Sequence, residues 1–390
     1  MSKRPTPDEV LHDIRKKLPG VKIMRASDPA AQLQTQAFGI PELDELTGGM
    51  LCGGFTTLWG PEKAGKSSIA CRATAQAQRD GRRMLWVDLE GRFDPSWAQL
   101  QGADLDELWI QNCGQDLEAN LDAVNELIRE GAIDGLVIDS IIARASRAEL
   151  MDKNDVAKSI AKDTIANIPK KLSQWFRVVS ALMADKKIPA ILLSQVRTYG
   201  LGSGMAYSAK SGGNALSHWG STELKISRHT QKIEATKQGE KLQLGYWMRC
   251  ELKKTSLNAN EGKQILLPFY FGIGVDDIAC AVRSGIDKKI ITRGGTGRIT
   301  FEDSSWPSEN NLVEKARENS ELGDAIIQAV AAASQDAIGG ETAVIAEAEE
   351  DTMPVEAPPE EFVCLLEECG QVFGTARGLK GHQTKMHKEA

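Results

Sequence analysis

The chain has 390 residues, of which 41% are hydrophobic and 26% are charged, a composition typical of a globular protein with room for two or three domains. No apolar run reaches the length of a membrane span and no apolar signal region follows Met1, so we expect a cytoplasmic protein with no membrane partner. The formal net charge is −7, but residues 336–361 carry nine acidic residues and neither Lys nor Arg. This segment accounts for the negative balance, so the charge does not exclude nucleic-acid binding by the rest of the chain.

Residues 1–36 begin with a helix signal. Thr6 can act as the N-cap, a proline follows at the first helical position, and Glu9 completes a capping box. A helix to about Leu18 is followed by Val21–Arg25, which predicts a lone strand. A helix and a strand of this size cannot bury a core alone. This pair must therefore dock on the rest of the chain or on a neighbouring subunit.

A complete phosphate-binding loop of the form G-x-x-x-x-G-K-S occupies residues 60–67. The run Phe55–Trp59 before it predicts a buried strand, and Ser68–Gln78 after it predicts a helix, a context that argues against a chance match on a surface turn. Backbone N–H groups and the helix dipole favour an anion there. Lys66 would reach the β- and γ-phosphates of ATP, and Ser67 would hold Mg²⁺. The expected ATP contacts from this segment are Gly60, Pro61, Glu62, Lys63, Ala64, Gly65, Lys66, Ser67 and Ser68.

Apolar strands alternate with helices between Phe38 and about Phe271. This alternation predicts an α/β fold with a mainly parallel sheet and helices on both faces. The expected strands are Thr56–Trp59, Met84–Asp88, Leu108–Asn112, Gly135–Ile138 and Ala190–Ser194, and the expected helices include Leu117–Arg129 and Lys158–Ala184. Residues 198–213 are rich in Gly and Ser and have no period, so we expect a mobile, functional loop.

Three segments are expected after a core of residues 37–271. Residues 272–334 predict a small α+β lobe, and residues 335–361 an acidic, disordered linker that contains three prolines. Residues 362–388 have the features of a separate module, described below.

Two of the expected strands end in acids. Gly135–Ser140 places Asp139 at a carboxyl end, where a carboxylate can orient Mg²⁺ through water. Met84–Glu90 is a second such strand, and one of its acids could position the attacking water. A solvated turn residue is the alternative interpretation of Glu90.

The order and spacing of several segments resemble those of bacterial RecA and the related phage recombinases. The resemblance spans roughly Pro7–Ala332. Of the segments given next in chain order, the last four are the most specific, because a generic ATPase would not share them. The segments are Val21–Arg25, Gly60–Ser68, Val87–Glu90, Asp94–Trp97, Leu136–Ser140, Leu193–Arg197 and Gly212–Leu216.

The resemblance implies a RecA-like P-loop ATPase core and an N-terminal arm that adds a strand to the sheet of the next subunit. A head-to-tail interface that does not close builds an open helical filament. A RecA-like core joined to a C-terminal zinc finger, the module described below, suggests a protein of a phage or mobile element. We therefore expect it in the cytoplasm of a bacterial or phage-infected cell.

The same resemblance implies roles for individual residues. Glu90 is the general base that activates water, Asp94 bonds the adenine and Trp97 stacks on it. Gln195 senses the γ-phosphate and signals to the loop that follows it. Lys253 reaches from the neighbouring subunit to stabilise charge in the transition state. Two positions after Lys253 the family has a second basic residue, whereas this chain has Thr255. Either Lys254 substitutes for that residue or ATP hydrolysis is slower.

Two DNA-binding loops are also implied. The second corresponds to residues 198–211, a polar Gly-rich loop whose amides can hold phosphates while apolar and aromatic side chains wedge between bases. The first is expected near residues 151–159, where ordinary solvated lysines are the alternative interpretation. The candidate DNA contacts are Lys153, Lys158, Arg197, Tyr199, Leu201, Met205, Tyr207, Gly212, Gly213 and Asn214.

The last module has the spacing of a ββα zinc finger with two Cys and two His ligands. Phe373 and Leu379 fall where such a finger keeps its small core. Two of its three base-reading positions, Gly378 and Gly381, have no side chain, so sequence-specific readout is not expected. A tethering role is favoured, with DNA and protein both open as partners. The expected Zn²⁺ ligands are Cys364, Cys369, His382 and His387.

The leading hypothesis is an ATP-dependent homologous recombinase that forms filaments on single-stranded DNA and exchanges strands with a duplex. Loader or single-strand-binding proteins would be further partners. One alternative is an accessory RecA-like ATPase or a helicase-type motor without strand exchange. Another is a regulatory ATPase whose finger binds protein.

Overall fold

The computed structural model describes residues 10–11, 14, 16–18, 21, 23–112, 116–140, 168–199, 207–210, 218–237, 240–295, 297–330, 332–333, 362–363 and 372–373. The chain divides into two compact units, Met1–Ala332 and Ala333–Ala390.

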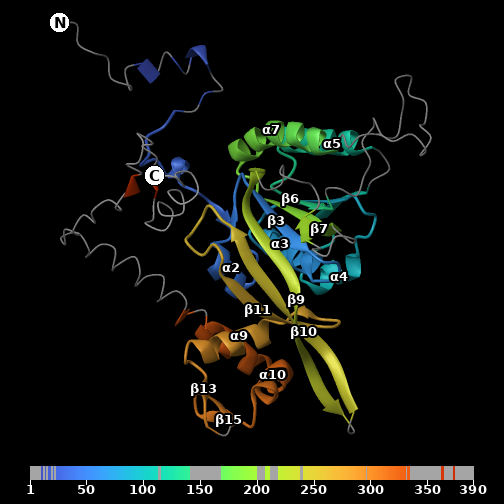
Figure 1. Ribbon diagram of the computed structural model, residues 1–390, viewed down its shortest axis with the longest axis vertical. Coiled ribbons are helices and arrows are strands. Elements are labelled where there is room, and N and C mark those ends of the chain that lie inside the picture. The colour runs from blue at the N-terminus through green and yellow to red at the C-terminus, as the bar shows by residue number, and fades with distance from the viewer. Residues whose placement is uncertain are drawn as a thin grey trace, which may run out of the picture. The chain divides into compact units, whose positions relative to one another are not determined.

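The larger unit is built on a ten-stranded sheet (Figure 1) with the order β12-β11-β10-β9-β3-β7-β6-β4-β5, and β8 pairs with β7 off this path. The strands from β3 to β7 run parallel to their neighbours, as the alternation of strands and helices predicts, and we call them the parallel half. They are β3 (Phe55–Gly60), β4 (Met84–Asp88), β5 (Leu108–Asn112), β6 (Gly135–Asp139) and β7 (Ala190–Tyr199).

Helices cover both faces of the parallel half because successive strand residues point to opposite sides. On one face α3 (Lys66–Arg79) packs in a core that includes Leu58 and Trp86. On the other face α5 (Leu117–Arg129) and α7 (Ile168–Lys186) share a core with Leu85 and Val87, and Figure 1 shows these two helices side by side. The short helix α4 (Pro95–Leu100) lies between β4 and β5 in the chain.

The sheet continues from β3 into four strands that sequence analysis did not foresee. β9 (Gly220–Lys237) lies parallel to β3, and β10 (Glu240–Lys254), β11 (Gln264–Tyr270) and β12 (Gly274–Val275) follow antiparallel. We call these four strands the antiparallel half. The far part of the β9–β10 hairpin extends beyond the residues of β10 that pair with β11.

A small lobe follows the sheet and has its own core, in which Val282, Ile299, Leu312 and Ile326 pack with Ile233 of β9. Asp276 and Ser308 cap two of its helices with their side chains. Its elements are α9 (Asp277–Asp287), the strands β13 (Thr292–Arg293), β14 (Ile299–Phe301) and β15 (Ser304–Trp306), α10 (Glu309–Glu318) and a helix over residues 320–330.

Small elements precede β3 in the larger unit. Strands β1 (Thr35–Gln36) and β2 (Met50–Leu51) pair antiparallel. Helix α2 (Pro41–Thr47) lies between them in the chain, and the 3₁₀ turn η1 (Pro29–Ala31) precedes them.

Three expectations about elements need correction. None of the described residues of 21–25 lies in a strand, and Val21, Ile23 and Met24 are exposed. A strand needs a partner strand, and in the part of the chain that the structure describes no strand pairs with Val21, Ile23 or Met24. The described part of the helix expected over Lys158–Ala184 runs from Ile168 to Lys186.

The third correction concerns the loop expected over residues 198–213. β7 continues to Tyr199 and pairs antiparallel with β8 (Tyr207–Lys210), so the described residues of this segment lie in strands. Tyr199 pairs with Tyr207, and aromatic residues favour strand pairing even in a segment that is rich in Gly and Ser.

In the smaller unit, β16 (Phe362–Val363) pairs antiparallel with β17 (Val372–Phe373). The four expected zinc ligands and the acidic linker lie outside the described residues. Among the helices that the structure describes, none is both long and apolar enough to cross a membrane.

Candidate nucleotide site

The phosphate-binding loop connects the end of β3 to the start of α3. A Cβ at Gly60 would lie 1.9 Å from the Ile226 carbonyl oxygen of β9, so only glycine fits. Gly65 caps α3 with a φ of 102°, a conformation that L side chains rarely adopt. No acidic residue lies in the first turn of α3, so the positive end of the helix dipole is not opposed there.

The ammonium group of Lys66 is held inside the loop. Its Nζ donates to the Gly60 carbonyl at 3.0 Å and to the Pro61 carbonyl at 2.7 Å. Burial lowers the pKa of Lys66, and the carboxylates of Asp139 and Glu90 oppose that shift. A buried cation near two acids suits a site for a phosphate chain with its metal ion.

Ser67 and Asp139 come together as a pair of oxygen ligands. The Ser67 hydroxyl donates to Asp139 Oδ2 at 3.2 Å, although the two residues lie on different elements. The pKa of Asp139 is raised to about 6, mainly by burial and then by the nearby Glu90 carboxylate, while the Ser67 hydrogen bond opposes the shift. A divalent cation would offset this concentration of negative charge. The residues present therefore fit Mg²⁺.

A turn after β4 presents Glu90 to the end of β7. Asp88 is buried and accepts hydrogen bonds from the backbone N–H groups of Gly91 and Phe93, each at 2.8 Å, so it shapes this turn. Glu90 Oε1 accepts a hydrogen bond from Gln195 Nε2 at 2.9 Å. The strand pattern alone left open which acid of this strand serves the site, and the resemblance assigned Glu90. The contacts give Asp88 a structural role in the turn and leave Glu90 facing Gln195.

The two residues expected at the adenine lie on α4. Asp94 caps the helix by accepting from the Trp97 N–H at 3.1 Å. The Trp97 indole N–H donates to the Ser68 hydroxyl at 3.1 Å, which ties α4 to the start of α3. The Trp97 ring centroid lies 6.3 Å from that of Phe269.

A pocket of about 330 Å³ opens beside the loop. One wall is made by residues 63–68, and the other comes from the antiparallel half through Arg228, Tyr246, Phe269 and Phe271. Sequence analysis missed these four residues. The aromatic run at 269–271 was the only local signal, and no short motif joins it to a loop about two hundred residues earlier in the chain.

Other expected site residues are not gathered at this pocket. Lys253 lies on β10, where its Nζ contacts the Glu251 carboxylate, and it does not line the pocket. Thr255 accepts a hydrogen bond from the Leu257 N–H at 3.1 Å and so belongs to the turn after β10.

The expected DNA contacts are described only in part. The backbones of Arg197 and Tyr199 lie in β7, and that of Tyr207 lies in β8. The remaining candidates lie outside the described residues: Lys153, Lys158, Leu201, Met205, Gly212, Gly213 and Asn214. Within the part of the chain that the structure describes, no group of three or more His, Cys, Asp or Glu side chains could hold a metal ion.

Comparison with known proteins gives a consistent result. Residues 7–275 match the family model described as the RecA N-terminal domain. The chain is 30% identical over 323 residues to Protein RecA of Streptococcus gordonii, with 82% of each chain covered. It is 28% identical over 327 residues to Protein RecA of Thermus thermophilus, which covers 82% of this chain and 92% of that one. Among solved structures it is similar to the crystal structure of the RadB recombinase, with a TM-score of 0.44 and 18% sequence identity over 60% of this chain and 96% of that one.

Proposed function

This chain belongs to the RecA N-terminal domain family, and we propose that it is an ATP-dependent homologous recombinase. In this proposal it assembles on single-stranded DNA with ATP and Mg²⁺, searches a duplex for homology and exchanges strands.

The hydrogen bond between Gln195 and Glu90 is the observation that supports this proposal best. It connects the acid proposed to activate water with β7, the strand that runs into the β7–β8 segment proposed to bind DNA. A recombinase must make DNA binding depend on the nucleotide, and this contact gives a direct physical route between the two sites.

The residues around the loop divide the work of phosphoryl transfer. Lys66 supplies positive charge beside the β- and γ-phosphates, and Glu90 accepts a proton from water. Ser67 and Asp139 would hold Mg²⁺, which neutralises phosphate charge when it is bound. Asp94 and Trp97 are proposed to bind the adenine.

Filament assembly is proposed to use the free edge at β5. This strand ends the order of the main sheet, and its Trp109 and Ile110 side chains are 67% and 39% exposed. The exposed apolar residues Val21, Ile23 and Met24 form a segment of matching character that has found no partner strand among the described residues of its own chain. An open sheet edge pairs readily with an extended segment from another chain. The two features support a head-to-tail contact in which the arm of one copy adds to the β5 edge of the next.

Two variants test this contact. Deletion of residues 1–30 and Trp109→Asp should each leave nucleotide binding intact and abolish DNA-dependent assembly in sedimentation. Val178→Asp, which places the same charge on an exposed apolar position of α7, is the matched control. Normal assembly of both test variants would contradict the proposed contact.

The same assembly would bring Lys253 of one copy to the nucleotide of the next. Within one chain its partner is the Glu251 carboxylate on the same strand, and both side chains are partly exposed. An exposed pair of this kind is weak, so it can exchange for a phosphate contact.

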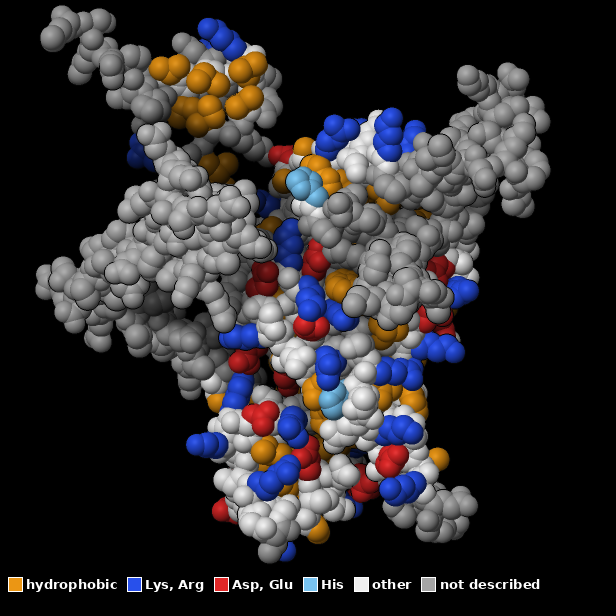
Figure 2. Space-filling view, in the orientation of Figure 1, with side chains coloured by type: hydrophobic (Ala, Val, Ile, Leu, Met, Phe, Trp, Pro, Cys, Tyr) orange, Lys and Arg blue, Asp and Glu red, His pale blue; other side chains and the backbone are white. Residues whose placement is uncertain are grey.

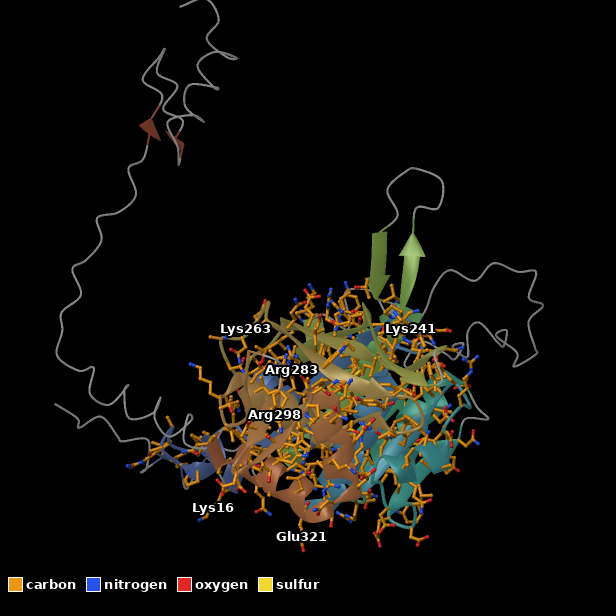
Figure 3. All side chains as sticks on the ribbon, turned by 90° about the horizontal axis from the view of Figure 1, so that it is seen from below. Lys16, Lys241, Lys263, Arg283, Arg298 and Glu321 are labelled. Carbon is orange, nitrogen blue, oxygen red and sulfur yellow. The ribbon has the colours of Figure 1, made fainter. Side chains whose placement is uncertain are left out.

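DNA contacts are proposed at the loops. In the lower half of the view in Figure 2, basic and acidic side chains are interspersed, and neither charge forms a continuous stripe. From below, the labelled basic residues Lys241, Lys263, Arg283 and Arg298 lie on the side of the larger unit that Figure 3 turns to the viewer. Because acidic side chains lie among these basic ones, this side does not indicate a duplex site, and the proposed DNA contacts stay at the two loops.

The C-terminal module is proposed to bind Zn²⁺ and to tether the chain to DNA or to protein. The β16–β17 pairing supports this, because in the sequence Cys364 directly follows β16 and Cys369 precedes β17, the order of a ββα finger. Zinc analysis of the purified chain and of a Cys364→Ser, Cys369→Ser double variant tests it. Equal zinc content in the two proteins would contradict it.

Electron microscopy with single-stranded DNA and a slowly hydrolysed ATP analogue tests the main proposal. A recombinase should form helical filaments, and joint molecules should appear when a homologous duplex is added. Closed rings would favour a helicase-type motor. Filaments that form no joint molecules would favour an accessory ATPase.

A further inference from the structure

One backbone carbonyl of the phosphate-binding loop is held from outside the loop. Lys63 has a φ of 56°, in the left-handed region that non-glycine residues rarely occupy. Its carbonyl oxygen accepts from Arg228 Nε at 2.9 Å and from Arg228 Nη2 at 2.7 Å. The Tyr246 hydroxyl donates to the same oxygen at 3.3 Å. These three hydrogen bonds to one carbonyl oxygen fix the loop at Lys63, whose left-handed backbone conformation is unfavourable for a non-glycine residue.

The pairing of β9 with β3 brings Arg228 near the loop, because Trp59, the residue before Gly60, pairs with Lys225. A bulge in β9 directly follows Arg228. Between the cross-strand pairs Arg228–Met248 and Lys232–Tyr246, β9 contains three residues while β10 contains only Trp247. Extra residues on one strand form a β-bulge, which bends the strand and re-aims a side chain, and bulges are over-represented beside active sites.

Aromatic rings support the guanidinium group in that position. Its central carbon lies 4.3 Å from the centroid of the Tyr246 ring. Tyr246 is buried and stacks on Phe269, with the ring centroids 4.8 Å apart. Arg228 itself is exposed, so its fixed partners, and not burial, hold it in place. Such an arrangement uses the planar fork of arginine, which lysine lacks.

We propose that Arg228 is a positioning residue for the phosphate-binding loop. It holds the Lys63 carbonyl so that the following N–H groups face the phosphates, and it ties the loop to the β9–β10 hairpin. The proposal depends on the nucleotide site of the proposed function, and it is independent of strand exchange.

The test measures the affinity of the full-length protein for ATP and for inorganic triphosphate, with Mg²⁺ and without DNA. A fluorescent ATP analogue serves as the displaced probe. The variants are Arg228→Gln and Arg228→Lys. The matched control is Arg283→Gln on α9, whose guanidinium lies 5.8 Å from the centroid of Trp247 and which does not line the pocket.

Both Arg228 variants should lose about tenfold in affinity for ATP, because charge-assisted hydrogen bonds to one carbonyl are lost. Inorganic triphosphate should lose affinity by the same factor, because the effect acts on the phosphate-binding loop. Arg283→Gln should bind both ligands as the wild type does. The urea midpoint of the nucleotide-free variants should stay close to that of the wild type.

Four results would overturn the proposal. Wild-type affinity in Arg228→Lys would mean that positive charge alone matters and that Arg228 contacts the phosphates directly. Weaker ATP binding with an unchanged affinity for triphosphate would show that Arg228 acts on the nucleoside part of ATP and not on the phosphate-binding loop. If both Arg228 variants bound ATP and triphosphate as the wild type does, with or without a lower urea midpoint, Arg228 would have no role in positioning the loop. Absence of nucleotide binding by the wild type would overturn this proposal and the proposed ATPase together, whereas absence of filaments would overturn only the recombinase.

Discussion

The parallel and antiparallel halves of the main sheet serve the nucleotide pocket in different ways. The parallel half places Glu90 and Asp139 at the carboxyl ends of β4 and β6, where parallel α/β sheets place their ligands, and Gln195 of β7 beside the end of β3. The antiparallel half contributes Arg228 and Tyr246, which hold the backbone of the loop from the side. One half carries groups for chemistry, and the other fixes the loop on which that chemistry depends.

The difference predicts how strongly each half should respond to substitution. A group in direct contact with phosphate or water should have a larger effect than a group that acts through the backbone.

Lys66→Ala should have the largest effect. It removes a buried cation that faces the phosphates, so ATP affinity should fall by about a hundredfold or more. Isothermal titration with ATP and Mg²⁺ measures this, with Arg79→Ala at the other end of α3 as the control. A loss no greater than that of Arg228→Gln would remove the distinction between the two halves.

Glu90→Gln should lower ATP turnover by about 10² to 10⁴-fold while ATP binding and filament assembly persist, because only proton acceptance is lost. Single-turnover hydrolysis with saturating DNA measures this. Glu107→Gln, which removes an exposed carboxylate before β5, is the control. An unchanged rate in Glu90→Gln would return Glu90 to the role of a turn residue.

Asp139→Asn should have a smaller effect, and it should appear in stability. The pKa of Asp139 is about 6 in the folded chain against its ordinary value of 3.8, so the folded state binds this proton more tightly than the unfolded state. The resulting stabilisation is fully present below about pH 4 and is lost as the pH rises through 6. Without Mg²⁺ and nucleotide, Asp139→Asn should therefore be more stable than the wild type at pH 8, by up to about 3 kcal/mol, and nearly equal to it at pH 4.

Urea unfolding at the two pH values measures this, and Asp134 supplies a control of opposite sign. Its hydrogen bond to Arg83 lowers the pKa of Asp134, so Asp134→Asn should lose stability above pH 4. A gain for Asp139→Asn that is equal at both pH values would show that ionisation of Asp139 is not the cause.

The parallel half could be predicted from the sequence because its signals are local. The G-x-x-x-x-G-K-S pattern and short apolar runs, two of them ending in acids, predicted β3 to β6 within a residue at each end, whereas β7 continues five residues beyond its expected end. The antiparallel half has no such signal. Arg228 meets the Lys63 carbonyl because β9 pairs with β3, the strand that leads into the loop, and no pattern of spacing reports a contact across 165 positions. The described residues of Val21–Arg25 lie in no strand, which is what the proposed assembly expects of an arm whose partner is another copy.

The dependence of ATP turnover on DNA in Gln195→Ala tests the central claim most directly. The claim is that the contact between Gln195 and Glu90 joins the nucleotide pocket to the segment that binds DNA. The wild type should hydrolyse ATP faster when single-stranded DNA is added. Gln195→Ala should bind ATP within about twofold of the wild type and lose that stimulation. Stimulation of Gln195→Ala to the wild-type extent would contradict the claim.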